Sequence, residues 1–90
     1  MAKIEIERPD GDKLLSMHVD KWSEWTCEPS EFEWEYIDEE MAFVRKGKAL
    51  ITEAGGEDVE IKAGDLVTFP KGLKCHWKVT EPFNKVYSGG

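Results

Sequence analysis

The chain has 90 residues, a length typical of one domain. Its 19 acidic residues outnumber its 12 basic ones and give a formal net charge of −7, which disfavours binding to nucleic-acid phosphates and to anionic membranes. No apolar run reaches the ~18 residues that a membrane-spanning helix needs, and the first residues lack the apolar core of a signal peptide. Two cysteines are too few for a disulfide framework, so we expect a reduced, cytoplasmic protein.

The small size also predicts an oligomer. A chain this short buries only a limited core on its own. Short strands leave exposed edges that need to be covered, and residues 3–7, which alternate charged residues with isoleucine, are a candidate edge. We therefore expect a homodimer, the commonest oligomer of soluble proteins.

Taken in chain order, short alternating segments separated by turn signals predict about eight to ten strands and almost no helix. The expected strands cover residues 3–7, 22–27, 32–37, 41–45, 48–53, 59–61, 66–69, 73–79 and 84–87. A helical turn capped by Asp12 is expected over residues 13–17. Lys46 and Gly47 are predicted to close a hairpin, and Glu81 and Pro82 to separate the last two strands.

This count of strands is typical of a jelly-roll barrel. An immunoglobulin-like sandwich is the alternative, although the chain lacks the Cys, Trp, Cys spacing of such domains. The strand expected over residues 32–37 alternates cleanly, with Phe32, Trp34 and Tyr36 on one face and glutamates on the other.

Two motifs resemble those of the cupin family. Gly64, Pro70 and Gly72 match the spacing of the second cupin motif, in which a histidine stands at the position of Cys75. In the first cupin motif, two histidines precede a glutamate and a glycine. Here the same spacing is filled by Trp34, Tyr36, Glu40 and Gly47.

The chain therefore resembles the small single-domain cupins related to (S)-ureidoglycine aminohydrolase and to ethanolamine-utilisation cupins, over about residues 22–87. The resemblance implies an all-β fold, the cupin double-stranded β-helix or jelly-roll barrel, as a single domain over residues 1–90, with a pocket inside the barrel. It does not imply one reaction, because a single fold supports many chemistries.

The positions of the family's metal ligands are mostly altered. An indole such as that of Trp34 cannot ligate a metal and a phenol such as that of Tyr36 rarely does, while Glu40 and Cys75 alone make a poor site. We therefore expect no bound metal and no other cofactor. His76 follows Cys75 directly, and strand alternation predicts that it points to the opposite face.

Glu40, Cys75 and Tyr36 are the candidate catalytic residues. Cys75 is either a small buried hydrophobe or a reactive thiol. Glu40 is either a proton acceptor or a turn carboxylate paired with a lysine. Burying an unpaired carboxylate is costly, so we expect that Glu40 serves ligand binding.

Trp34, Tyr36 and Trp77 are the candidate ligand-binding residues, because they share the inward parity of Glu40 and Cys75 along the expected strands. They form either plain core or a stacking wall for a small planar or sugar-like ligand. The leading hypothesis is a cupin that binds a small polar organic molecule, with or without metal-independent chemistry. The alternatives are a hydrolase resembling (S)-ureidoglycine aminohydrolase and a non-catalytic structural or interaction module.

Overall fold

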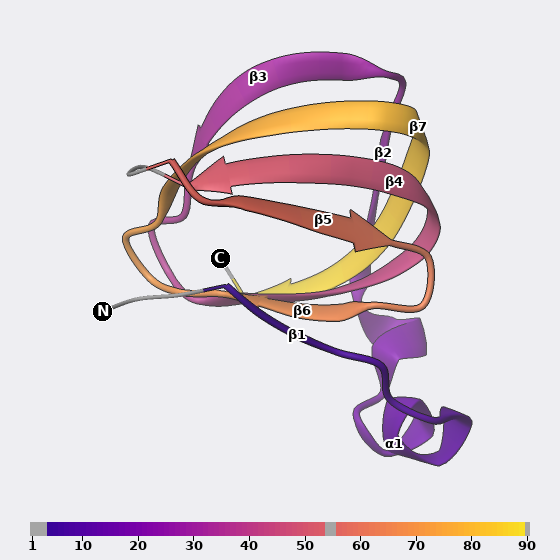
Figure 1. The fold of residues 1–90 in the computed structure, drawn as a ribbon. Helices are drawn as coiled ribbons and strands as arrows, with labels where there is room; N and C mark the ends of the chain where they lie inside the picture. The colour runs from indigo at the N-terminus through magenta and orange to yellow at the C-terminus, as the bar shows by residue number, and fades with distance from the viewer. Residues whose placement is uncertain (1–3, 54–55, 90) are drawn as a thin grey trace.

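A computed structural model describes residues 4–53 and 56–89. Its strands curve around a common interior as a barrel, and a short helical segment projects at one end (Figure 1). The expectation of an all-β chain is confirmed. Among the described residues, no helix is long and apolar enough to cross a membrane. The elements are β1 (Glu5–Glu7), α1 (Gly11–Ser16), the 3-10 helix η1 (Val19–Lys21), β2 (Ser23–Cys27), β3 (Ser30–Glu35), β4 (Glu40–Glu53), β5 (Asp58–Lys62), β6 (Leu66–Phe69) and β7 (Lys74–Gly89).

The two longest strands, β4 and β7, pair antiparallel and form the frame of the barrel. Their first pairing, of residues 40–44 with 85–89, is flanked by β6 and then β1 on one side and by β2 on the other. Their second pairing, of residues 49–53 with 75–79, is flanked by β5 and by β3. The two parts face each other across the interior, as in a jelly roll.

The predicted breaks inside these two strands are wrong. Instead of closing a hairpin, Gly47 lies within β4 at a φ of 88°. The register shifts between Val44 and Ala49, and Pro82 lies where β7 loses its pairing to β4. Bulges bend a strand without ending it and accept a proline that cannot donate to the ladder. Four expected short strands therefore merge into two, and the described residues form seven strands.

The N-terminal segment also differs from the expectation. Asp10, and not Asp12, caps α1, because the Asp10 carboxylate accepts the backbone N–H of Lys13 at 2.9 Å. The next turn, η1, contacts β7 and buries Val19. The expected first strand shortens to β1, which pairs with β6. Lys3, which was included in that strand, lies outside the described residues.

The core lies inside the barrel and is rich in aromatic rings. Tyr36 stacks on Phe69, with ring centroids 4.5 Å apart and an interplanar angle of 5°. Phe32 stacks on Trp77 at 5.9 Å. The predicted alternation of the third strand is confirmed, since Phe32 packs against the core while the glutamates on either side of it are exposed. The largest fully buried side chains are Trp77, Phe69, Ile51, Ile61, Leu66, Val44 and Val67.

Candidate functional site

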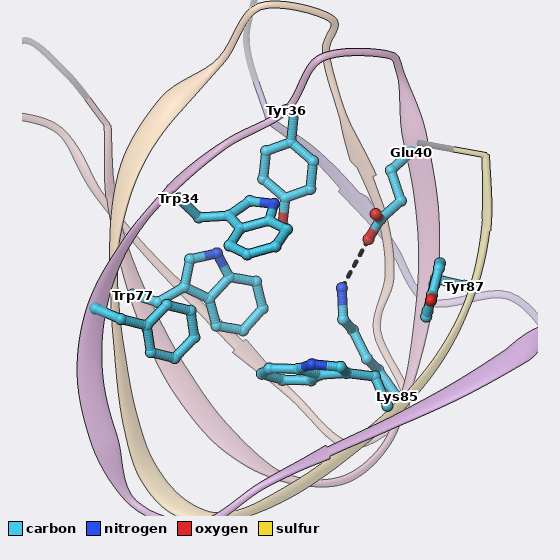
Figure 2. A pocket seen from close by; sticks show the side chains of 8 residues that line it. Trp34, Tyr36, Glu40, Trp77, Lys85 and Tyr87 are labelled. Atoms are coloured by element: carbon cyan, nitrogen blue, oxygen red, sulfur yellow. Dashed lines mark hydrogen bonds and ion pairs between the residues drawn. The ribbon is translucent and has the colours of Figure 1, made fainter.

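A cavity of about 180 Å³ lies inside the barrel and opens to its surface. Figure 2 shows Trp34, Tyr36 and Trp77 on one side of it and Glu40, Lys85 and Tyr87 on the other. A cavity of about 150 Å³ lined by apolar side chains admits benzene, so this one has room for a single small ring. Its lining consists of Trp25, Phe32, Trp34, Tyr36, Glu40, Trp77, Lys85 and Tyr87.

Strand register places these side chains on one interior face. Residues directly opposite each other in an antiparallel pair share a face. Phe32 on β3 lies opposite Trp77 on β7, and Trp25 on β2 lies opposite Lys85 on β7. The alternation of side chains along β7 then directs Tyr87 to the same interior as Lys85.

Lys85 and Glu40 form a buried ion pair on this lining. Lys85 Nζ lies 2.7 Å from Glu40 Oε2, and the two side chains are only 7% and 9% exposed. Burial lowers the pKa of Lys85 below its ordinary value, and the Glu40 carboxylate opposes that shift. The ammonium also lies 5.2 to 5.6 Å from four ring centroids, those of Trp25, Phe69, Trp77 and Tyr87, within the range of cation–π attraction.

This pair corrects the expectation for Glu40. The carboxylate is not unpaired, so its retention does not by itself require a ligand. The structure matches the alternative of a carboxylate paired with a lysine, but the pair lies inside the barrel, not in an exposed turn. Lys85 is the principal site residue that the sequence patterns missed. The available signal was its place in the strand predicted over residues 84–87, at the same parity as Tyr87.

Tyr36 lines the cavity but holds its proton firmly. Burial, and secondarily the charge of Glu40, raises the pKa of the Tyr36 phenol well above its ordinary value. The hydroxyl is therefore a hydrogen-bond donor, and not a base, at neutral pH. This environment gives Tyr36 a binding role more readily than a catalytic one.

Cys75 does not lie on the cavity lining. Its side chain is buried in the core, and its Sγ lies 3.7 Å from the backbone carbonyl oxygen of Trp34. Burial raises the pKa of the Cys75 thiol to about 11. Because the thiolate is the reactive form, this environment favours the buried-hydrophobe interpretation of Cys75 over the reactive-thiol one.

The two candidate tryptophans differ in their exposure. Trp34 is 53% exposed and lies at the open end of the cavity, whereas Trp77 is 2% exposed.

The Trp77 indole N–H lies near the Tyr36 hydroxyl and the Cys75 thiol, but it has no hydrogen-bond partner of good geometry among the described residues. An unpaired buried donor is rare and costly, and a ligand oxygen in the cavity would satisfy it.

His76 points away from the cavity, as strand alternation predicted. Its Nδ1 lies 3.0 Å from Glu33 and its Nε2 lies 3.1 Å from Glu31, both on the outer face of β3. These contacts raise the pKa of the His76 imidazole above its ordinary value. The histidine therefore takes no part in the interior site.

Comparison with known proteins assigns the family. Residues 15–87 match the EutQ-like cupin domain. A DUF861-family protein from Thermotoga maritima is 45% identical, with a TM-score of 0.94, over 96% of this chain and 98% of the other. The chain belongs to the EutQ-like cupin family. The predicted jelly-roll barrel and the resemblance to small cupins of the ethanolamine-utilisation type are therefore confirmed.

More distant cupins share the barrel but are longer. The Clostridium difficile EutQ protein is 25% identical with a TM-score of 0.65, over 71% of this chain, which spans only 50% of that protein. A putative ethanolamine utilization protein Q from Salmonella typhimurium, 19% identical with a TM-score of 0.64 over 93% of this chain and 66% of the other, shares the fold. No curated protein matches the chain.

The residues at the cupin ligand positions do not fit a metal ion. Trp34 offers no donor atom to a metal, and the Cys75 thiol is turned toward a backbone carbonyl. Glu40, at the position of the carboxylate ligand, instead holds the Lys85 ammonium. Across residues 4–53 and 56–89, no three His, Cys, Asp or Glu side chains are grouped to hold a metal.

Proposed function

We propose that this cupin binds a small, uncharged, planar organic molecule with a polar oxygen in its barrel cavity. The observation that carries the proposal is the lining itself, in which six aromatic side chains enclose an ion pair that is already neutral as a unit. A purely structural core has no need for an opening at this point, and an apolar pocket with a few polar groups is a usual place for a ligand.

The charges of the lining favour an uncharged ligand. Lys85 and Glu40 neutralise each other at 2.7 Å, so neither is left to compensate a charge on the ligand. Moving a charged molecule into a site of aromatic rings without a partner is costly. A neutral ligand instead gains stacking of its ring against the walls. The ligand oxygen can accept a hydrogen bond from the unpaired Trp77 N–H.

Three expectations from the sequence stay predictions. They are the hydrolase resembling (S)-ureidoglycine aminohydrolase, the homodimer and the cytoplasmic setting. No described contact favours the hydrolase, because the family's ligand positions do not form a metal site. The interaction-module alternative gains support only if the cavity binds nothing.

Binding of a matched set of probes tests the proposal. Benzyl alcohol, benzoate and benzylammonium carry the same ring with no charge, a negative charge and a positive charge. We expect benzyl alcohol to quench tryptophan fluorescence at the lowest concentration and to raise the melting temperature. Stronger binding of either charged probe would contradict the proposed neutral site, and the absence of binding by all three would remove the proposal.

Trp34→Ala tests whether the open end of the cavity contributes to binding. The substitution removes an aromatic wall that is already half exposed, so the fold should tolerate it. Loss of one aromatic contact of about 0.5–1.5 kcal/mol should weaken benzyl alcohol binding about two- to tenfold. Ile37→Ala is the matched control, because Ile37 is 74% exposed and is not part of the lining. Equal effects of the two substitutions would contradict a role for Trp34.

A further inference from the structure

We infer that Lys85 is an amine nucleophile and that the cavity holds a small conjugated aldehyde or ketone as a Schiff base on its Nζ. This inference rests on the proposed function, because it names the chemical class of the ligand for the same cavity. It assigns Lys85 a covalent role in place of a purely structural one.

The position of Lys85 Nζ supports a reaction inside the cavity. Lys85 is part of the lining, and its one hydrogen bond to a described residue runs to Glu40 Oε2 at 2.7 Å. An ammonium has three N–H donors, so the remaining ones face aromatic rings and the cavity. A carbonyl carbon that enters the cavity therefore meets the nitrogen without first displacing a network of hydrogen bonds.

The burial of Lys85 also favours its reactive form, against the Glu40 carboxylate and the surrounding rings, which favour the ammonium. Lysines become nucleophilic when burial favours the free amine over the ammonium, and burial lowers the pKa of Lys85. Glu40 is in contact with the nitrogen and can accept its proton. Lys13 provides the contrast. It also lies 2.7 Å from a glutamate, Glu7, but the two side chains are 46% and 52% exposed.

The reaction balances with these two residues alone. Lys85 Nζ gives one proton to the Glu40 carboxylate and attacks the carbonyl carbon, and the electron pair of the C=O bond moves to oxygen. Glu40 returns the proton to that oxygen and then takes a second proton from nitrogen. When Glu40 gives this proton to the hydroxyl, the C–O bond breaks, water leaves, and the nitrogen lone pair forms the C=N bond. The product is a protonated imine beside the Glu40 carboxylate.

The lining suits this product. The protonated imine keeps the positive charge of the ammonium, so Glu40 and the surrounding rings stabilise it as they stabilise Lys85 in the free protein. An aromatic or conjugated carbonyl compound adds a planar group that stacks on the walls. A cavity with few polar atoms also limits the water that would hydrolyse the imine.

Reductive trapping on the unmodified protein tests the inference. The protein is mixed with benzaldehyde and sodium cyanoborohydride near neutral pH, digested, and mapped by mass spectrometry. We expect a benzyl group on Lys85 early in the reaction, with Lys13 largely unmodified at the same time. The Lys85→Arg variant, which keeps the charge but lacks the amine, should lose the early adduct. Modification of Lys13 and the other exposed lysines before Lys85 would overturn the inference.

Benzyl alcohol separates a failure of this inference from a failure of the proposed function. It has the ring and the oxygen of benzaldehyde but no electrophilic carbon. If it binds and protects the cavity while Lys85 is not trapped by benzaldehyde, the binding site stands and the Schiff base is wrong. If neither compound engages the cavity, both proposals are wrong. If benzyl alcohol slows trapping at Lys85 but not at Lys13, both are supported.

Discussion

Lys85 and Glu40 form a polar contact in a place where most side chains are apolar. Both side chains are more than nine-tenths removed from water, and their atoms meet at 2.7 Å. Attraction within such a pair roughly offsets the cost of removing both charges from water, whereas removal of one partner leaves the other charge buried and uncompensated. The pair should therefore contribute little net stability, yet should be sensitive to any single substitution.

A double-mutant cycle tests this expectation. Glu40→Leu and Lys85→Met should each lower the free energy of unfolding by about 3–5 kcal/mol, because each leaves one buried charge alone. The double variant should recover most of that loss. Urea denaturation measures all three. The exposed pair of Lys13 with Glu7 is the control, and Lys13→Met should cost about 0–1 kcal/mol. A double variant as unstable as the sum of its singles would refute the coupling.

At the same scale, motif spacing and strand parity predicted part of the cavity lining. Trp34, Tyr36, Trp77 and Glu40 were assigned to the interior, and all four line the cavity. Strand parity placed Lys85 on the same face as Tyr87 but gave no sign of its burial, because lysine is almost never buried without a partner and the partner lies 45 positions away. Parity along a strand gives the face of a side chain but not its depth, which is why Cys75 falls in the core beside the cavity.

At the scale of elements, the sequence predicted the strands better than their continuity. Gly47 and Pro82 are ordinary signals for turns, and each was taken to separate two strands. In the structure they lie against each other at the bend of β4 and β7. Because Gly47 and Pro82 are far apart in the chain, local sequence patterns could not show that both belong to the same bend.

Gly47 should therefore be harder to replace than a glycine in an ordinary turn. A Cβ at Gly47 would overlap the Pro82 carbonyl oxygen, whereas a Cβ at Gly72 would meet no atom within 4 Å. Both glycines have positive φ, 88° and 83°. Gly72→Ala should cost about 1–2 kcal/mol from the backbone conformation alone, and Gly47→Ala should cost more. Equal shifts in the urea midpoint would show that β4 and β7 do not pack tightly at this bend.

At the scale of the whole molecule, the same rings serve as core and as cavity wall. Tyr36 and Trp77 belong to the hydrophobic core and also line the cavity. A barrel of 90 residues has little interior to divide between stability and binding. The sequence could not separate the two interpretations of these aromatics, because both require the same inward-facing side chains. The expected homodimer stays a prediction at this scale.

The indole N–H resonances of the four tryptophans give the most direct test of a ligand site inside the barrel. Trp25, Trp34 and Trp77 line the cavity, whereas Trp22 does not. Titration of the isotopically labelled protein with benzyl alcohol should shift the resonances of Trp25, Trp34 and Trp77 along one binding curve. The Trp22 resonance should not shift. Uniform small shifts of all four, or no shift at Trp77, would contradict the proposal that the barrel interior binds the ligand.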